Sequence, residues 1–210
     1  MLALGTGLVP DLVQFIKNEI MYYVVKYSGP FGFIKPWTAV RDGETYSQQF
    51  LTPSIVEGIE KKLFPEMLKQ NGIIQKIKRY KLQYSSINVQ QEQTQTRGWE
   101  KKSKEKMMVR NQSVLKRGVM INPVLFLAFD NKEDAEVATK QHLCLCRNED
   151  VLLPGESVLV LDEGDFECID GFELRFGVSE QSFLVGYNRM DGIKPMYGWL
   201  EMSGKPVLHV

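Results

Sequence analysis

The sequence predicts an α+β fold in which two helices alternate with strands. The periodicity of apolar residues changes in the order strand, helix, strand, strand, helix, strand, and several short β-rich segments with glycine turns follow. The chain has 210 residues, 43% of them apolar, which is enough for one sizeable core. We expect one compact unit with an N-terminal segment over residues 1–20, a core over residues 21–165 containing a basic arm over residues 85–117, and a β-rich extension over residues 166–210.

The first core segments are typical of a strand and a helix. Residues 22–27 are β-branched and aromatic and end at a Ser-Gly-Pro turn, which predicts a strand. Residues 52–63 have apolar side chains at helical spacing, and Ser54 with Glu57 has the spacing of a capping box. The same helical period places Glu60 on the face that is expected to meet solvent.

Residues 1–20 are apolar with a helical period, but Asp11, Lys17 and Glu19 interrupt them. This run is shorter than the ~20 apolar residues of a membrane span, and it lacks the basic start of a signal peptide. We expect a short amphipathic helix that docks on this chain or on a neighbour. The apolar residues of the loop over residues 31–37 are also expected to face a neighbouring subunit.

The second half of the core continues the pattern. Residues 74–84 alternate between apolar and polar, which predicts a half-buried strand, and the polar residues 85–96 begin a long excursion, either a β-hairpin or a partly mobile arm. An apolar strand is expected over residues 119–129, and Asn131 caps a helix over residues 133–146. With a fourth strand after this helix, the order is the βαββαβ of the ferredoxin-like (RRM-like) fold, which many unrelated functions share.

Charge is strongly segregated along a chain whose total charge is zero. Residues 1–75 contain seven bases and seven acids, residues 76–117 contain twelve and three, and residues 118–210 contain seven and sixteen, so the local charges are 0, +9 and −9. Charges act on one another within about 8 Å at cellular salt, so a neutral protein with this segregation can present a phosphate-attracting face.

The strongest candidates for nucleic-acid binding lie in the basic part of the arm. Trp99, Met107 and Met108 place aromatic and apolar surface among its cations, as a site that stacks a base while neutralising phosphates requires. The alternative is a solvated lysine-rich loop without a ligand, and composition does not separate the two. The candidate RNA-binding residues are Arg97, Trp99, Lys101, Lys102, Lys104, Lys106, Arg110, Lys116 and Arg117, with Lys35 and Arg41 from the loop after the first strand.

Four stretches carry a likeness to a known family: VVKYSGPFGFIKPW, ETYSQQFLTPSIVEGIEKKLF, INVQQEQ and RNQSVLKRGVMINPVLFLAF. Together they resemble the RAMP-superfamily subunit that caps the crRNA 5′ handle in type I CRISPR (Cascade) surveillance complexes, and they are most similar to the type I-C variety. The likeness spans roughly residues 22–146. It implies a ferredoxin-like RAMP core in antiviral defence that binds crRNA, contacts the large subunit and the multicopy backbone subunit, and meets target DNA indirectly.

The resemblance also implies a catalytic set, because type I-C members cut precursor crRNA without a metal. The matching residues are Tyr46, Lys140 and His142, which would supply a base for the ribose 2′-OH, an acid for the leaving 5′-oxygen and a cation for the phosphorane. Gln141 separates the last two, and two residues on a helix lie about 200° apart. We therefore expect crRNA binding without cleavage. Metal-independent endoribonuclease activity is the alternative, and for His142 a half-buried packing role is another.

Other classes of function leave their own motifs, and these are missing from the sequence. The three cysteines form no CxxC pair, which argues against a disulfide framework and a zinc site and fits a reducing cytoplasm. The sequence contains no Walker loop, no Gly-x-Ser-x-Gly and no clustered His-Asp-Glu metal set. We expect no cofactor, no metal and no membrane partner, and an RNA-binding assembly module without a CRISPR role is the remaining alternative.

Overall fold

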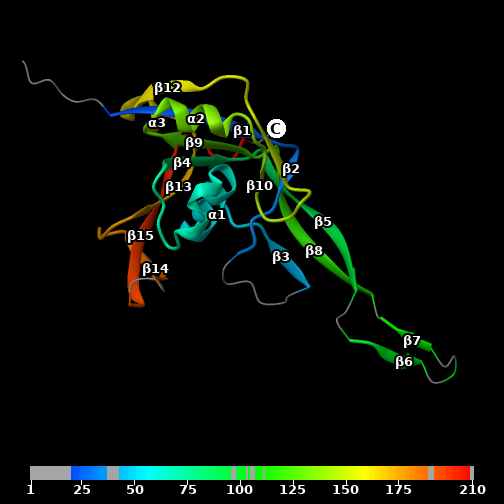
Figure 1. Cartoon of the computed structure of the whole chain (residues 1–210). Helices are drawn as coiled ribbons and strands as arrows, with labels where there is room; N and C mark the ends of the chain where they lie inside the picture. The colour runs from blue at the N-terminus through cyan, green and yellow to red at the C-terminus, as the bar shows by residue number, and fades with distance from the viewer. Residues whose placement is uncertain are drawn as a thin grey trace, which may run out of the picture.

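The computed structural model describes residues 20–36, 43–95, 98–102, 104, 107–110, 112–188 and 192–208. Apart from Ile20, the predicted amphipathic segment lies outside the described residues. Within them the chain is an α+β protein with many strands and few helices (Figure 1). None of the described helices is both long and apolar enough to cross a bilayer.

The centre of the molecule is a nine-stranded sheet. Five of its strands are β1 (Met21–Ser28), β4 (Ile77–Gln83), β9 (Val124–Phe129), β11 (Val151–Pro154) and β12 (Leu159–Asp162). β9 pairs with β1 on one side and β4 on the other, while β11 and β12 pair with opposite ends of β1, and all these pairs are antiparallel. Helix α1 (Pro53–Leu63) lies between β1 and β4 along the chain, and α2 (Lys132–Ala138) lies between β9 and β11. The predicted order of the main elements is therefore confirmed.

The remaining elements extend this sheet or lie beside it. The sheet is completed by β10 (Leu143–Cys144), β13 (Gly171–Phe176), β14 (Phe183–Asn188) and β15 (Lys194–Ser203). The other elements are β2 (Phe31–Gly32), β3 (Glu44–Tyr46), the 3-10 helix η1 (Pro65–Lys69), β5 (Ser86–Gln95), β6 (Glu100–Lys102), β7 (Met107–Val109), β8 (Gln112–Ile121) and α3 (Glu163–Glu167).

The two faces of the sheet carry separate apolar clusters. On one face, Ile59 of α1 and residues of α2 pack in the same buried cluster as Tyr27 of β1. The Tyr27 hydroxyl donates a 2.6 Å hydrogen bond to the carbonyl oxygen of Ala138, which fixes the end of α2 on the sheet. On the other face, Phe166 of α3 packs against Tyr22 with ring centroids 5.6 Å apart. Both helices of the core order thus share one face, and α3 covers the other.

Helix α1 forms where the sequence predicts it, but without the predicted capping box. The Ser54 hydroxyl lies 3.1 Å from the Thr52 hydroxyl, and no side chain caps the helix N-terminus. Glu57 instead accepts hydrogen bonds from the Lys61 ammonium and from the backbone N–H of Gly72. The Glu57 carboxylate, which a capping box would direct to the helix N-terminus, therefore binds the loop after α1 instead.

The expectation that Glu60 faces solvent is wrong, because this side chain is buried. Its carboxylate accepts hydrogen bonds of 2.8 to 2.9 Å from the backbone N–H groups of Gln75, Lys76 and Ile77. A buried charge is tolerated only when it is fully hydrogen-bonded, and these three donors satisfy it. Glu60 therefore joins α1 to the start of β4.

One predicted strand is divided into two, and one predicted helix ends earlier than expected. The apolar run over residues 119–129 is interrupted at Asn122, which has a φ of 48°, and at Pro123, which has no N–H to donate to a neighbouring strand. Strand β8 therefore ends before Asn122, and β9 begins after Pro123. The helix expected to reach Cys146 ends at Ala138, and the following residues Leu143 and Cys144 pair with β11. The partner strand is a tertiary contact that local periodicity does not reveal.

Strand β4 is buried on both faces rather than on one. Arg79 donates two 2.6 Å hydrogen bonds to Glu173 of β13, and a third, of 2.9 Å, to Glu167 of α3. Lys81 is fully buried and contacts the Ser203 hydroxyl and the Glu167 carboxylate. Because α3 and β13 cover this face, its polar residues are enclosed in an ion-pair network.

The C-terminal strands continue the main sheet beyond β4. β13 pairs with β4 where Phe172 lies opposite Leu82, and β15 and β14 follow outward in antiparallel order. The final residues return to β4, where Tyr84 and Val207 form a parallel bridge. The extension therefore shares a sheet with the core.

Candidate nucleic-acid interface

The predicted basic arm projects from the body of the molecule (Figure 1). Its described residues form the strands β5, β6, β7 and β8, and β8 continues to Ile121, four residues beyond the predicted end of the arm. β5 and β8 pair without a break from Ser86 opposite Ile121 to Gln95 opposite Gln112. Farther out, β6 and β7 pair with Lys101 opposite Met108. Of the two forms expected for the excursion, the described residues adopt the β-hairpin.

The base of the arm is held by β3, which pairs with β8 in parallel. A Cβ atom added to Gly118 would overlap the ring of Tyr46, so this ring lies directly against the glycine backbone. The backbone N–H of Ser47 donates a 2.7 Å hydrogen bond to the Gly118 carbonyl oxygen. The arm thus leaves the body from a four-stranded base, in which β8 pairs with β5, β3 and β2.

Arg117 is part of this base. Its guanidinium donates a 3.0 Å hydrogen bond to the Thr45 hydroxyl, lies 3.5 Å from the Glu92 carboxylate and stands over the ring of Phe33 at 5.8 Å. Arg147 stands over the same ring at 5.5 Å. Phe33 is only 4% exposed, so the expectation that this loop residue faces a neighbouring subunit is wrong.

The outer part of the arm exposes aromatic, apolar and basic side chains together. Trp99, Met107 and Met108 are each more than half exposed, and Lys101 and Lys102 are exposed beside them. The Arg110 guanidinium lies 4.5 Å from the centroid of the Trp99 ring, in cation–π contact. Aromatic surface beside cations is what binding of single-stranded nucleic acid by base stacking and phosphate neutralisation requires.

The other RNA-binding candidates lie at several places. Lys104 is exposed in the outer turn, Lys116 lies 4.0 Å from the Glu44 carboxylate at the base, and Lys35 is exposed in the loop after β2. Arg41, Arg97 and Lys106 lie outside the described residues. Most of the described candidates therefore lie in the outer arm, whereas Lys116 and Arg117 interact with acidic residues at its base.

The three catalytic candidates are separate in their described interactions. The Tyr46 hydroxyl donates a 2.9 Å hydrogen bond to Glu44, and this bond, together with the nearby negative charge and burial, raises the tyrosine pKa. Lys140 and His142 follow the end of α2 and are exposed, while Gln141 between them bonds to the Leu63 carbonyl oxygen of α1. Within the described part of the chain no hydrogen bond or ion pair joins Tyr46 to Lys140 or His142.

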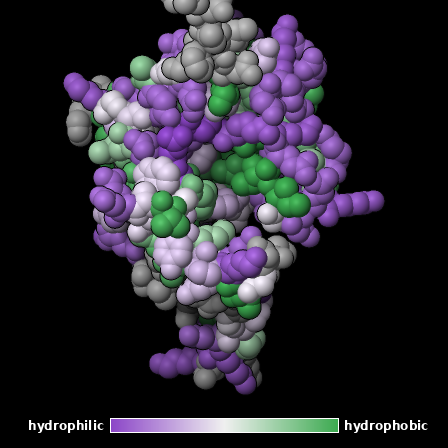
Figure 2. Space-filling view, turned by 90° about the vertical axis from the view of Figure 1, so that its left-hand side faces the viewer, coloured by the Kyte–Doolittle hydropathy of each residue, from purple (hydrophilic) through white to green (hydrophobic). Residues whose placement is uncertain are grey.

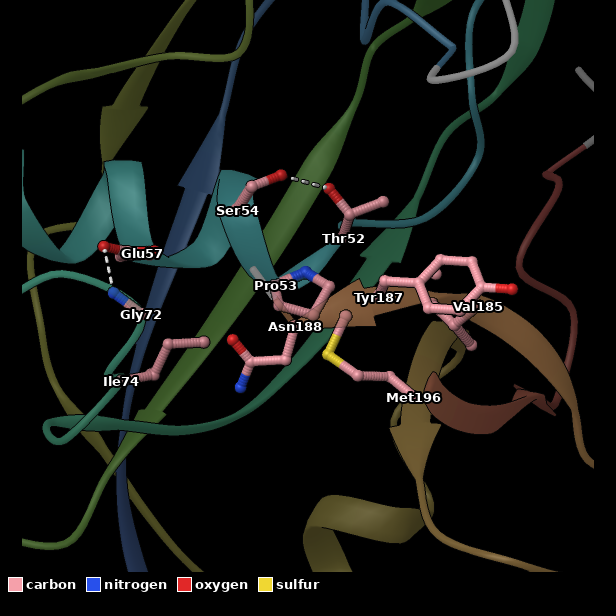
Figure 3. A pocket seen from close by; sticks show the side chains of 11 residues that line it. Thr52, Pro53, Ser54, Glu57, Gly72, Ile74, Val185, Tyr187, Asn188 and Met196 are labelled. Atoms are coloured by element: carbon pink, nitrogen blue, oxygen red, sulfur yellow. Dashed lines mark hydrogen bonds between the residues drawn. The ribbon is translucent and has the colours of Figure 1, made fainter. Parts of the chain in front are cut away.

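A cleft of about 480 Å³ lies between the N-terminus of α1 and the C-terminal strands (Figure 3). Ile74, Met196 and Tyr187 line it, and its polar side chains are engaged locally, as in the Thr52 to Ser54 hydroxyl contact. Figure 2 shows hydrophobic surface bordering a hollow on this side of the molecule. Sequence reasoning missed this cleft, because its walls come from segments more than a hundred residues apart.

The same sheet face exposes apolar residues beyond the cleft. Phe176 and Phe183 both pair with Gly198, from the two sides of β15, so they lie on the same sheet face. Both rings are more than 40% exposed, and Met202 on this face is 64% exposed. An apolar surface of this kind is typical of a protein contact.

No protein-family model and no curated protein matches this chain. One solved structure that it is similar to is a chain described as "CRISPR RNA-guided surveillance complex", with 11% sequence identity over 87% of this chain and 90% of that chain and a TM-score of 0.49. A likeness of this size does not identify a family.

Proposed function

We propose that this chain is a crRNA-binding subunit of a CRISPR antiviral surveillance complex, which holds the 5′ handle of the guide RNA and contacts the large and backbone subunits. The observation that carries the RNA-binding part is the outer arm, where Trp99, in cation–π contact with Arg110, and the exposed lysines Lys101, Lys102 and Lys104 project from the body. The assignment to CRISPR rests on the four sequence stretches that resemble the type I-C subunit.

The strand order supports a ferredoxin-like RAMP core. In the βαββαβ succession the fourth strand lies beside the first, the first beside the third and the third beside the second, and β11, β1, β9 and β4 lie in this order. Helices α1 and α2 lie together on one face of this sheet. The arm is then an insertion between the second and third strands of the core.

The contacts with other subunits have a matching surface on the extension. Phe176, Phe183 and Met202 expose apolar side chains on one sheet face, next to the cleft that Tyr187 and Met196 line. Burial of apolar surface stabilises protein association by roughly 25 cal/mol per Å² before the cost of association is deducted. In this proposal RNA and protein partners therefore occupy opposite ends of the molecule.

One structural observation keeps metal-independent cleavage of precursor crRNA as the second candidate. Because α2 ends at Ala138, Lys140 and His142 are not held on opposite sides of a helix, as the sequence pattern had implied. We still prefer binding without cleavage. The Tyr46 hydroxyl donates a hydrogen bond to Glu44 and has a raised pKa, and a tyrosine that stays protonated at neutral pH is a poor general base.

The experiment that tests RNA binding by the arm replaces Lys101, Lys102, Lys104 and Lys106 together with alanine. If each lysine neutralises one single-strand phosphate, the slope of log Kd against log salt should flatten by about 0.7 per contact, roughly 3 in total. The matched control replaces four exposed lysines outside the arm, Lys62, Lys69, Lys132 and Lys205, and should leave the slope nearly as it is. Equal slopes for the arm variant and the unmodified protein would rule out the proposal.

A further inference from the structure

The two faces of the outer arm are chemically different, as the pairing of β6 with β7 shows. Residues directly opposite each other in an antiparallel pair have side chains on the same face, and successive residues alternate between faces. The register places Glu100 opposite Val109, Lys101 opposite Met108 and Lys102 opposite Met107. One step farther along the same register, Trp99 comes opposite Arg110, which their cation–π contact supports.

The register therefore divides the outer arm into two sets of side chains. The first face, here called the Trp99 face, consists of Trp99, Lys101, Met108 and Arg110. The second face, here called the Glu100 face, consists of Glu100, Lys102, Met107 and Val109. The Trp99 face carries two cations and no acid, whereas on the Glu100 face the carboxylate offsets the one lysine.

The Trp99 ring is arranged to receive a planar ligand. Arg110 covers one face of the indole at 4.5 Å, and the side chain as a whole is still 56% exposed. An indole held in place by a guanidinium loses less freedom when a base stacks on its open face, so less of the stacking free energy is spent on ordering the side chain. Lys101 stands on the same face, one pleat away, where it can meet the backbone phosphate of a stacked nucleotide.

We propose that the Trp99 face binds an unpaired segment of single-stranded nucleic acid by stacking and phosphate neutralisation, and that the Glu100 face is turned away from it. This inference rests on the proposed function, since it specifies which side of the arm carries the RNA. The ligand class is an unpaired strand because a duplex hides the base faces that an exposed indole requires. The Glu100 carboxylate would repel phosphates from the opposite face.

Lys101 and Lys102 provide a matched pair for the test. They are adjacent, of the same type, in the same strand and both exposed, but they lie on opposite faces. Each is replaced separately with alanine in the full chain, and binding of a fluorescein-labelled oligouridylate is followed by anisotropy over a range of salt. We expect Lys101→Ala to flatten the salt slope by about 0.7, and Lys102→Ala to change it by much less.

Stacking is read out independently of charge. Binding of unlabelled oligouridylate should quench tryptophan fluorescence, and Trp99→Phe should remove most of that quenching because the responding indole is gone. Trp99→Ala, which leaves no ring to stack, should weaken binding roughly 5- to 100-fold. Met107→Ala, on the Glu100 face, should leave both signals nearly unchanged, and circular dichroism of each variant checks that the chain is folded. Quenching that persists in Trp99→Phe would overturn the stacking role.

The outcomes separate this inference from the proposal beneath it. If Lys101→Ala and Lys102→Ala flatten the slope equally while the fourfold arm variant binds weakly, the arm binds RNA but without a preferred face, and only the face assignment is overturned. If the fourfold variant binds as the unmodified protein does, both are overturned. A larger effect at Lys101 than at Lys102, with quenching that depends on Trp99, supports both.

Discussion

The ring of Tyr46 lies against the backbone of Gly118, so closely that a Cβ at position 118 would overlap it. This contact joins β3 to β8 at the base of the arm, where the Ser47 N–H also bonds to the Gly118 carbonyl oxygen. Tyr46 is the residue that the resemblance to type I-C subunits marks as catalytic, and here it contributes to the attachment of the arm. A structural role for Tyr46 can be tested separately from a catalytic one.

Gly118→Ala should destabilise the protein by roughly 1–3 kcal/mol, because the added methyl group overlaps a ring that β3 holds in place. Urea unfolding measures the loss, and combination with Tyr46→Ala should recover part of it, since the smaller side chain removes the overlap. Gly58→Ala is the matched control. Gly58 lies inside α1 with nothing within 4 Å of an added Cβ, so this change should stabilise the helix by about 1 kcal/mol.

Glu60→Gln should destabilise the protein by roughly 1–3 kcal/mol. The amide has one acceptor oxygen in place of two, so at least one of the buried N–H groups at the start of β4 loses its partner. Thermal or urea unfolding gives the magnitude. Glu66→Gln, at an exposed carboxylate 3.1 Å from the Lys76 ammonium, is the control and should change stability much less, because exposed ion pairs contribute little. An equal loss in both variants would contradict a stabilising role for the buried hydrogen bonds of Glu60.

The acid stability of the protein should depend on Glu167 of α3. Burial raises the pKa of this carboxyl group, but the Arg79 hydrogen bond and the charges of Arg79, Arg175 and Lys81 lower it by more, so its folded-state pKa lies below the ordinary 4.5. A carboxyl group with a depressed folded pKa contributes stability that is fully present above pH 4.5 and is lost as the pH falls through the folded value.

Glu167→Gln should therefore reduce stability above pH 4.5, and its difference from the unmodified protein should shrink as the solution is acidified below that pH. Urea unfolding at several pH values gives this difference directly. Glu180→Gln, at an exposed site away from this network, serves as the control and should show no comparable trend. A difference that grows on acidification would contradict the assigned direction of the pKa shift.

We expect the purified protein to bind CRISPR repeat RNA without cleaving it. Purified protein is incubated with a labelled CRISPR repeat RNA in EDTA, alongside His142→Ala and Tyr46→Phe. We expect the RNA to be bound and uncut in all three, because the described interactions of Tyr46 do not reach Lys140 or His142. Specific cleavage that disappears in His142→Ala would show instead that the protein is a metal-independent endoribonuclease.

The order of the main elements could be predicted from the sequence, because strand and helix periods are properties of neighbouring residues. The aromatic strand before Ser28, the helix after Thr52 and the alternating strand before Ser85 all formed close to their predicted positions. The arm could also be predicted, since a long polar and basic segment between apolar strands has no place in the core. Its hairpin pairing agrees with one of the two forms that its composition allowed.

The prediction failed where a distant segment determined the environment of a residue. Glu60 is buried because the loop before β4 brings three N–H donors to it, and Arg79 and Lys81 are buried because α3 and β13 close over a face that alternation predicts to be polar. The helix after Asn131 stops at Ala138 because β11 pairs with the residues that the helical period would have continued through.

The sequence by itself determined the local elements and the concentration of positive charge in the arm, since both follow from residues close together in the chain. Only the tertiary structure decided which side chains share a face. Trp99 and Arg110 meet because the register of β6 with β7 brings them opposite each other, and Tyr46 meets Gly118 because β3 pairs with β8. Register and strand pairing are set by the packing of the whole chain, and composition does not contain them.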